Sequence, residues 1–379
     1  MIKSYKYRMY PTKKQEESLL RTLTTCRYLY NNALAERINK YKEDKTSVSY
    51  VDQANFLSKN KNEYQSKIHT QVLQDTLKRL DKSFKNFFRR VKNGEKAGFP
   101  RFKAENRFNS FCYPQSGFKI TNDQKRIYLS KIGEIRIEYS REIAGKIKTC
   151  SVIKDADYWY ISITAETNPI VVKSTNPKSV GIDLGIKAFA VLSDGQVIEN
   201  PRHTRNSEKK LAKEHRRLSR KKKGSNNRKK QRLVVARTHR KIRNQRNDFL
   251  HKTSTNLVRE YGKLIFENLN IKGMVRNHKL AKHISDCSWN RLIQLVQYKA
   301  EEAGVELVLV NPRNTTQMCS GCGEIVPKDL SDRIHCCPHC GLVMDRDLNA
   351  AINIENTAGT VEINACRESV RPKNIRQFS

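Results

Sequence analysis

The chain has 379 residues, with 74 Lys or Arg against 38 Asp or Glu and a formal net charge of +36 at pH 7. So much positive charge is tolerable when a polyanion neutralises it, which favours a nucleic-acid partner over a merely soluble basic surface. The longest wholly apolar run covers residues 188–192, too short to span a bilayer, and no apolar signal segment follows Met1. These features disfavour membrane and secreted proteins. We expect a cytoplasmic, nucleoid-associated chain of two or three domains.

The N-terminal part predicts helices inserted into a small β-barrel. Residues 2–10 alternate as a strand, and Thr12 with Gln15 forms a capping-box pattern that opens a helix. Apolar residues recur at helical spacing as far as residue 88, so we interpret residues 13–95 as a helical unit. Four later segments alternate or are rich in β-branched and aromatic residues, and we expect them to be barrel strands: 127–129, 133–139, 146–153 and 158–164.

Basic and aromatic residues are interleaved between residues 99 and 113. Such a set suits base stacking combined with phosphate contact, and barrel packing explains the aromatic residues equally well. Arg101 and Lys103 are the candidate nucleic-acid contacts of this segment.

Residues 201–246 carry 20 Lys or Arg and two Glu, half of the net charge. Residues 224–227 break the segment into two predicted helices, each with a single apolar stripe. A solvated helix face is the usual reason for a charge run, but charge of nearly one sign would fray an unbound helical hairpin. We therefore favour nucleic-acid contact, with these candidate residues: Arg216, Arg217, Arg220, Lys221, Arg240 and Arg243.

The remaining sequence predicts an α/β core. Residues 180–200 read as a β-hairpin, and a second apolar strand ends at Glu267. An amphipathic helix follows over residues 289–303, and residues 305–310 form a further strand. Alternation of strand, helix and strand is typical of α/β folds.

Acidic residues lie at the ends of these elements. Asp183 lies in the strand 180–186, whose even positions are apolar, and Glu267 ends its own strand. The glycines at 181 and 185 would let a metal ion and a phosphate approach the backbone beside Asp183. Three carboxylates gathered in one fold suit two Mg²⁺ ions, the apparatus that cuts phosphodiester bonds. Each acid alone has an ordinary explanation as a turn, edge or strand-end residue, so the prediction depends on the whole set.

The third acid is one of two. Asp345 and Asp347 both precede a predicted helix that begins at Leu348. Asp347 also fits a helix N-cap, which would stabilise the helix by about 1 kcal/mol, and Asp345 competes with it for the metal role. Periodicity does not decide between these two residues.

Clustered cysteines predict a zinc site, because thiols in the cytoplasm stay reduced. Cys319 and Cys322 form one CxxC pair, and Cys337 and Cys340 form a second; a glycine follows each pair. Four thiolates bind zinc tetrahedrally without an open position, so the ion would be structural and would fold a small insert with about 10–16 kcal/mol of binding energy. Cys336 is the alternative to Cys337. A redox CxxC is disfavoured because two pairs occur together.

Together these motifs resemble TnpB, the RNA-guided nuclease that insertion-sequence transposons encode and that is ancestral to type V CRISPR effectors. The resemblance runs over nearly the whole chain. It departs from the family pattern at His335, where an aromatic residue is usual, and at Cys336, which adds a thiol. The segments that carry the resemblance are residues 7–12, 98–103, 181–185, 266–269, 315–323, 330–333, 337–341 and 345–350.

The resemblance implies a RuvC-like, RNase H-like nuclease core with Asp183, Glu267 and Asp347 as its acids, and it prefers Asp347 to Asp345. It also implies a wedge β-barrel with an inserted helical recognition domain. The expected boundaries are 1–12 for the first wedge strand, 13–95 for the recognition domain, 96–176 for the wedge barrel, 177–312 for the nuclease core, 313–343 for the four-cysteine zinc ribbon, 344–358 for the last core helix and 359–379 for the tail.

The implied activity is cleavage of both strands of double-stranded DNA at a single site, directed by a guide RNA made from the transposon end. Two Mg²⁺ ions and one structural Zn²⁺ are the implied metals, and a monomer is the favoured state. A short motif that flanks the target would be recognised by the protein. Gln71, Tyr113 and Gln115 are candidates for reading it, because they are polar and lie in or beside the recognition and wedge segments.

Three other interpretations stay open at this point. A compact type V CRISPR effector would differ in its genomic neighbourhood, which would hold a spacer array instead of a transposon end. A nucleic-acid-binding regulator with an idle nuclease is disfavoured, because all three acids are intact. A strand-transferring transposase would yield joined DNA products instead of simple cuts.

Overall fold

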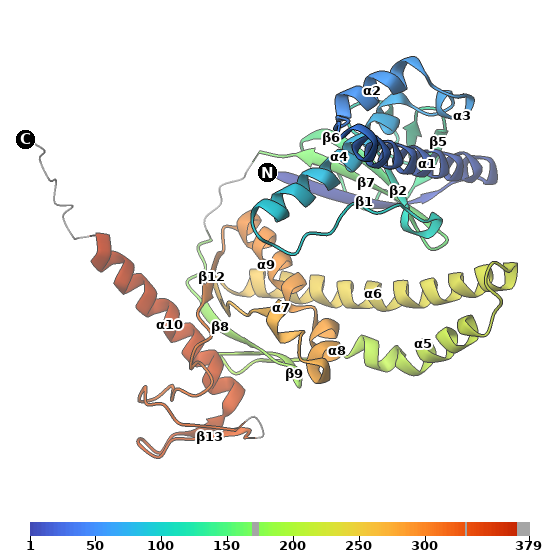
Figure 1. Ribbon diagram of the computed structural model, residues 1–379. Coiled ribbons are helices and arrows are strands. Elements are labelled where there is room, and N and C mark those ends of the chain that lie inside the picture. The colour runs from blue at the N-terminus through green and yellow to red at the C-terminus, as the bar shows by residue number, and fades with distance from the viewer. Residues whose placement is uncertain (169–173, 330–331, 370–379) are drawn as a thin grey trace, which may run out of the picture. The chain divides into compact units, whose positions relative to one another are not determined.

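The computed structural model describes residues 1–168, 174–329 and 332–369 (Figure 1). Residues 169–173 of the expected barrel, Leu330 and Ser331 of the family motif, and residues 370–379 of the expected tail lie outside this part. The chain divides into two compact units, Met1–Pro169 and Ile170–Ser379. No helix within the described residues is both long enough and apolar enough to cross a membrane.

The first unit is built on a seven-stranded antiparallel sheet with the order β2-β6-β7-β1-β5-β4-β3. Strand β1, Ile2–Tyr10, lies in its middle and pairs with β7 from Ile2↔Glu166 to Met9↔Trp159. The prediction that residues 2–10 join strands from much later in the chain is therefore confirmed. The other strands are β2 (Ser110–Tyr113), β3 (Phe118–Ile120), β4 (Arg126–Leu129), β5 (Gly133–Ile137), β6 (Lys146–Asp155) and β7 (Tyr158–Glu166).

This sheet does not close into a hydrogen-bonded barrel. Its edge strands β2 and β3 do not pair with each other among the described residues. Side chains bridge the edges instead: the Tyr113 ring centre lies 6.4 Å from that of Phe118, and the Tyr113 hydroxyl donates to the Ser130 carbonyl at 3.0 Å. The expected β-barrel is thus an open sheet whose edges approach each other through side chains.

The helical unit between β1 and β2 consists of α1 (Lys13–Asp44), α2 (Tyr50–Lys59), α3 (Glu63–Ser66) and α4 (Thr70–Lys92), followed by the short 3₁₀ helix η1 (Glu105–Arg107). The capping box is confirmed, because Thr12 Oγ1 accepts from the Gln15 N–H at 3.4 Å and Gln15 Oε1 accepts from the Thr12 N–H at 3.0 Å. Leu19 of α1 and Leu77 of α4 are buried in one core with Ile161 of the sheet.

The second unit is built on a five-stranded sheet with the order β10-β9-β8-β11-β12. Three of its strands are parallel: β8 (Ser179–Leu184), β11 (Lys263–Glu267) and β12 (Glu306–Val310). Strands β9 (Ala188–Leu192) and β10 (Val197–Glu199) continue from β8 in antiparallel fashion. The segment expected to be a two-stranded hairpin over residues 180–200 therefore contains three strands.

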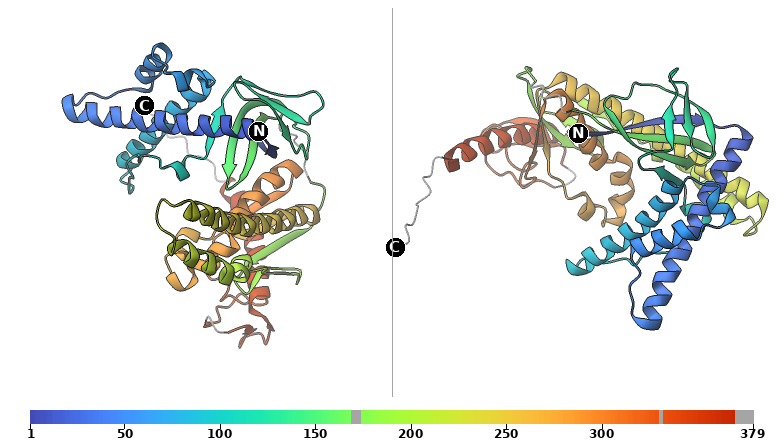
Figure 2. Two further views of the ribbon diagram at one scale, coloured as in Figure 1. Left: turned by 90° about the vertical axis from the view of Figure 1, so that its right-hand side faces the viewer. Right: turned by 90° about the horizontal axis from the view of Figure 1, so that it is seen from above.

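Helices cover both faces of this sheet (Figures 1 and 2). On one face α6 (Asn226–Glu260) and α9 (Trp289–Ala303) pack on even-numbered strand residues, and Ile182 and Phe266 are buried there with Leu292. On the other face, Ile265 lies in a buried cluster with Ile354 of α10 (Arg346–Ser369). The predicted alternation of strand and helix is thus realised as three layers. The remaining helices are α5 (His203–Ser219), α7 (Ile271–Met274) and α8 (His278–Cys287).

A small insert separates β12 from α10. It contains the antiparallel strands β13 (Ile334–Cys336) and β14 (Val343–Asp345), and it carries the two CxxC pairs. Strand β14 ends where α10 begins. The insert is therefore continuous with the helix that covers one face of the sheet.

Gly181 lets α10 approach β8 at backbone contact. A Cβ atom at this position would lie 2.1 Å from the Ala351 carbonyl oxygen and 2.6 Å from the Glu355 backbone nitrogen. The expectation that Gly181 opens space for a metal ion or phosphate is therefore wrong, because a helix occupies that space. At Gly185, the added Cβ would lie 2.8 Å from the Ala188 carbonyl oxygen of the following turn.

We predict that Gly181→Ala destabilises the second unit by about 1–3 kcal/mol or more, because the added methyl group overpacks a contact between two backbones. Trp289 of α9 is buried in the core of this unit. Urea unfolding followed by Trp289 fluorescence in a Trp159→Phe background would measure the change. Gly98→Ala is the matched control, because nothing lies within 4 Å of a Cβ there. Equal stability of the two glycine variants would contradict the prediction.

Candidate functional site

Asp183 and Glu267 lie level with each other on neighbouring parallel strands. The pairing of β8 with β11 matches Phe266 to Ile182, and each acid is the next residue of its strand. Side chains alternate along a strand, so both carboxylates share the face that carries Gly181 and Ile265. That is the face covered by α10.

Asp347 approaches the same region from α10. Residues spaced by four share one face of a helix, so Asp347, Ala351 and Glu355 point the same way. Ala351 crosses β8 at Gly181, and the Glu355 carboxylate accepts hydrogen bonds from the Ser179 and Ser193 hydroxyls on one side of the crossing. Asp347 lies one turn, about 6 Å, to the other side. Asp183 lies on that side too, about 6.6 Å beyond Gly181 along the strand.

The three carboxylates act on one another electrostatically. Burial, and after it the charges of Glu267 and Asp347, raise the pKa of Asp183 from 3.8 to about 8. Burial also raises the pKa of Glu267, against the opposite effect of a hydrogen bond from Thr315. Like charges raise a carboxyl pKa when they lie nearby, so Glu267 and Asp347 are neighbours of Asp183 on the face of the sheet that α10 covers. Without a cation this site disfavours full ionisation.

Two residues that sequence reasoning missed hold these acids. The buried Thr315 hydroxyl donates a hydrogen bond to Glu267 Oε1. The Arg346 guanidinium contacts Asp347 Oδ1 through Nε at 3.1 Å and through Nη2 at 3.0 Å. The same guanidinium acts to lower the pKa of Asp183. No spacing pattern in the sequence marks either residue. Thr315 matters because it contacts Glu267, which is distant in the chain, and Arg346 matters because it begins α10 beside Asp347.

Asp345 and Asp347 have different structural roles. Asp345 Oδ1 accepts hydrogen bonds from the backbone N–H groups of Asp347 at 2.8 Å and Leu348 at 3.1 Å. Helix α10 begins at Arg346, so Asp345 is its N-cap, and the interpretation of Asp347 as the cap is wrong. Asp347 lies in the first helical turn, where the helix dipole stabilises an anion.

The four predicted zinc cysteines form a compact cluster. The sulfur atoms of Cys319, Cys322, Cys337 and Cys340 all lie within 4.8 Å of one another. Two of the separations, Cys319 to Cys340 and Cys322 to Cys337, are 3.6 Å. A disulfide would need about 2.05 Å, whereas Zn–S bonds of about 2.3 Å in a tetrahedron separate the sulfurs by about 3.8 Å. The geometry therefore fits a tetrahedral metal and not a disulfide.

The same cluster decides the role of Cys336, because Cys336 is exposed and its sulfur is not part of the four. The three carboxylates do not form such a group among the described residues. The four thiols do form one, because their ligand atoms all lie within 4.8 Å of one another.

His335 is the other departure from the family pattern. Its side chain is fully buried, and this burial lowers its pKa.

Two asparagines of α10, also missed, connect the cysteine cluster to the acids. The Asn349 side chain donates to the Met318 carbonyl at 2.7 Å and accepts from the Ser320 N–H at 2.9 Å. The Asn353 amide donates to the Thr315 carbonyl at 2.9 Å and to the Met318 carbonyl at 2.6 Å. Both asparagines are buried. They fasten the loop that holds Glu267 at one end and begins the cysteine cluster at the other.

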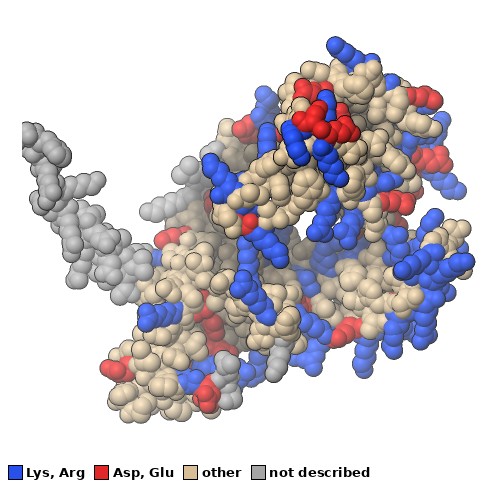
Figure 3. Space-filling model, viewed as in Figure 1, with Lys and Arg blue, Asp and Glu red and all other residues tan. Residues whose placement is uncertain are grey.

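Helices α5 and α6 present a strongly basic surface (Figure 3). The buried Glu214 of α5 joins the two helices, because its carboxylate accepts from the Gln231 amide of α6 at 2.7 Å. It also pairs with Arg217 of its own helix at 3.1 Å. Helix α6 continues to Glu260, beyond the basic segment that ends at residue 246. Five of the candidate contacts in this hairpin are exposed: Arg216, Arg217, Arg220, Lys221 and Arg243.

Three of the other candidate contacts, Arg240, Tyr113 and Gln71, are buried or engaged within the protein. Arg240 is 8% exposed, and Tyr113 is 1% exposed. Gln71 Oε1 accepts hydrogen bonds from Ser116 at its N–H and its hydroxyl, each at 3.1 Å. Only a rearranged protein would offer Arg240 or Tyr113 to a nucleic acid, so their choice as surface contacts disagrees with the structure. Gln115 and Arg101 are exposed, and Lys103 is half-buried.

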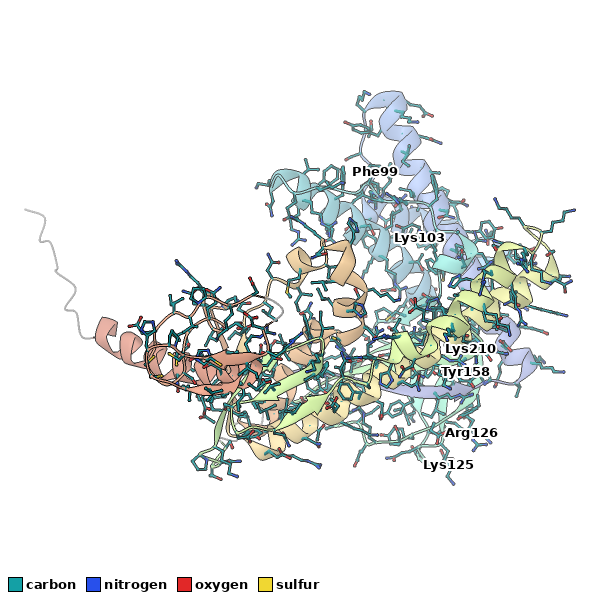
Figure 4. All side chains as sticks on the ribbon, turned by 90° about the horizontal axis from the view of Figure 1, so that it is seen from below. Phe99, Lys103, Lys125, Arg126, Tyr158 and Lys210 are labelled. Atoms are coloured by element: carbon teal, nitrogen blue, oxygen red, sulfur yellow. The ribbon has the colours of Figure 1, made fainter. Side chains whose placement is uncertain are left out.

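A further basic and aromatic surface lies on the sheet of the first unit, where sequence reasoning looked only at residues 99–113. The Arg8 guanidinium lies 3.7 Å from the ring centre of Tyr158, and the Lys6 ammonium lies 4.1 Å from that of Tyr160. Figure 4 labels Tyr158 here, Arg126 at the start of β4, and Lys103 on the segment after α4. The sequence signal for this surface was the alternation of basic residues, Lys6 and Arg8, along β1. Such sets suit stacked bases and phosphates.

Comparison with known proteins identifies relatives along the chain. Family models match residues 1–46 ("Helix-turn-helix domain"), 162–278 ("Probable transposase") and 289–354 ("Cas12f1-like, TNB domain"). The fold is similar to that of Cas12f1 in the cryo-EM structure of the Cas12f1–sgRNA–target DNA complex, with a TM-score of 0.56 over 94% of this chain and 99% of that chain. The sequence identity is 13%, so this likeness concerns the fold alone.

Curated relatives extend over nearly the full length. The "Putative RNA-guided DNA endonuclease" of Streptomyces pristinaespiralis is 36% identical, over 98% of this chain and 92% of its own length. The "Putative RNA-guided DNA endonuclease InsQ" of Escherichia coli (strain K12) is 32% identical, over 98% and 95%. The "TnpB-like protein L79" of Acanthamoeba polyphaga mimivirus is 26% identical, over 58% and 45%. Identity and coverage at this level, with the matching motifs, show that the chain belongs to the TnpB family of transposon-encoded proteins.

Proposed function

We propose that this protein is a guide-RNA-directed endonuclease that cuts both strands of double-stranded DNA with one RuvC-like site made of Asp183, Glu267 and Asp347. The observation that carries the proposal is the convergence of these acids from β8, β11 and α10, where burial, and after it the charges of Glu267 and Asp347, raise the pKa of Asp183 to about 8. Hydrolytic nuclease sites need such a concentration of carboxylates. The names of the full-length relatives support the RNA guide and the DNA substrate.

The donor set fits Mg²⁺. Carboxylate oxygens are hard ligands, and a divalent cation would offset both the burial of the Asp183 charge and its repulsion by Glu267 and Asp347. When bound, two such ions supply activation of the attacking water and stabilisation of the leaving 3′ oxygen. Asp183, Glu267 and Asp347 would hold them. Thr315 orients Glu267 through its hydrogen bond, and Arg346 carries positive charge beside Asp347.

The four thiolates of Cys319, Cys322, Cys337 and Cys340 would hold one structural Zn²⁺. Their role in cleavage is positional, because the loop that leads into the cluster is fastened to Asn349 and Asn353 of the helix that bears Asp347. The exposed basic residues of α5 and α6 would contact nucleic-acid phosphates, and the outer face of β1 offers a second such surface. A target-flanking motif read by the protein stays part of the proposal.

We predict that Asp183→Asn, Glu267→Gln and Asp347→Asn each lower Mg²⁺-dependent cleavage at least about a hundredfold, because each removes one charge from the site. Guide RNA and target DNA should still bind. Cleavage of a matched duplex by the purified RNA complex, and a gel-shift assay with the same complex, would measure the two effects. Asp345→Asn is the matched control and should retain cleavage, since Asn caps a helix about as well as Asp. Full activity of Asp347→Asn would overturn the site.

We predict a pH effect on stability in Mg²⁺-free buffer. Between the ordinary carboxyl pKa of 3.8 and about 8, the folded protein keeps a proton on Asp183 that the unfolded chain releases. The free energy of unfolding therefore falls as pH rises through this range. Asp183→Asn removes this contribution. The free energy of unfolding of the variant, relative to that of the wild type, should therefore rise steadily from pH 4 to pH 8. Urea unfolding at several pH values would test it, and parallel curves would contradict the predicted coupling.

We predict that Cys337→Ser abolishes binding of the structural zinc, whereas Cys336→Ser retains one zinc per chain, because only Cys337 belongs to the cluster. Loss of zinc should also reduce cleavage, since the loop that orients Glu267 through Thr315 loses one of its two supports. Zinc released on thiol modification, measured with a colorimetric chelator, gives the stoichiometry. Zinc retained by Cys337→Ser and lost by Cys336→Ser would reverse the assignment.

A further inference from the structure

A cavity of about 320 Å³ lies at the end of β8 in the second unit. Side chains from four parts of the chain line it, and most of its charged side chains are basic. The lining residues that matter here are Lys187 of the β8–β9 turn, Arg202 and Arg205 at the start of α5, His283 and Asp286 of α8, and Arg333 just before β13.

The acid in this lining is already neutralised. Asp286 pairs with Arg246 at 3.0 Å, and its carboxylate accepts from the Thr204 hydroxyl at 2.6 Å and the Thr204 N–H at 3.1 Å. It therefore also occupies the N-terminus of α5, so the positive character of the cavity comes from side chains and not from the helix end. Near the cavity, Glu208 pairs with Lys282.

The basic side chains of the lining are available by contrast. Among the described residues, Lys187, Arg205 and Arg333 form no ion pair within 4.0 Å. Lys187 and Arg205 are also exposed. Converging cations in a hollow, with Leu280 and Ile186 as apolar walls, suit a phosphate group attached to a larger molecule.

The cavity is connected to the proposed cleavage site through β8 and through the start of α10. Ile186, which lines it, follows Asp183 by three residues, a span of at most about 10 Å. On the other side, the Arg333 carbonyl accepts from the backbone N–H of Arg346, and Arg346 pairs with Asp347. Successive phosphates of a strand advance by about 3.4 Å along the helix axis in duplex DNA. A strand cut at the acids would therefore bring a phosphate only a few nucleotides away into the cavity.

We propose that this cavity is a phosphate subsite for the DNA strand being cut, in which Lys187 and Arg205 contact one non-bridging phosphate oxygen pair near the scissile linkage. The inference rests on the proposed nuclease function and deepens it. The subsite positions the strand across Asp183, Glu267 and Asp347. Lys187 and Arg205 are thus positioning residues, because they act on a phosphate other than the one that reacts.

The test combines neutral DNA linkages with protein variants. The protein is purified with its guide RNA, and target duplexes carry one methylphosphonate linkage at a time, on each side of the cut and in each strand. In the wild type, one linkage near the cut should slow cleavage about 10- to 100-fold, the effect of losing a charge-assisted hydrogen bond. Arg205→Gln and Lys187→Gln should slow cleavage of unmodified DNA by a similar factor and should be insensitive to that same linkage.

Arg259→Gln is the matched control, because Arg259 is an exposed arginine at the end of α6 outside the cavity lining. It should keep the wild-type rate and the full sensitivity to the neutral linkage. The subsite would be overturned, and the nuclease function left intact, if the wild type cuts but no linkage loses its effect in Arg205→Gln or Lys187→Gln. A wild-type complex that cuts none of the matched duplexes would overturn both.

Discussion

The backbone contact between α10 and β8 at Gly181 is the constraint on which the proposed site depends. No side chain separates the helix from the strand there, so the position of α10 along β8 is tightly defined. Glu355 is held by the Ser179 and Ser193 hydroxyls on one side of the contact, and Asp347 is directed toward Asp183 on the other. A strand and a helix more than 150 residues apart in sequence thereby bring their acids to one region of the fold.

Electrostatic repulsion is the cost of this arrangement. Burial and neighbouring charges raise the pKa of Asp183. The other two acids have partners within the protein, because Thr315 donates a hydrogen bond to Glu267 and Arg346 forms an ion pair with Asp347. These partners compensate only part of the negative charge. The remainder is what a divalent cation would balance.

Local patterns predicted the elements well where one interaction decides the structure. The capping box at Thr12, the strand that ends at Glu267 and the cysteine set all follow from residues close in sequence or from fixed ligand chemistry. Long-range contacts defeated the same reasoning. Gly181 was interpreted as space for a ligand because the helix that fills this space begins at residue 346. Tyr113 was a candidate for reading a DNA motif, with barrel packing as the open alternative, and the structure buries its ring beside His69 and Phe118. The N-cap role of Asp345 became clear only from the position at which α10 begins.

The position of the cysteine cluster explains how a metal without open coordination sites can matter for cleavage. The loop from Thr315 to Ser320 is held at one end by the cluster and along its length by Asn349 and Asn353. Thr315 in turn holds Glu267, and the two asparagines belong to the helix that presents Asp347. Displacing this loop would therefore disturb two of the three acids together. A structural zinc ion here would act through geometry, by keeping Glu267 and Asp347 in fixed positions relative to Asp183.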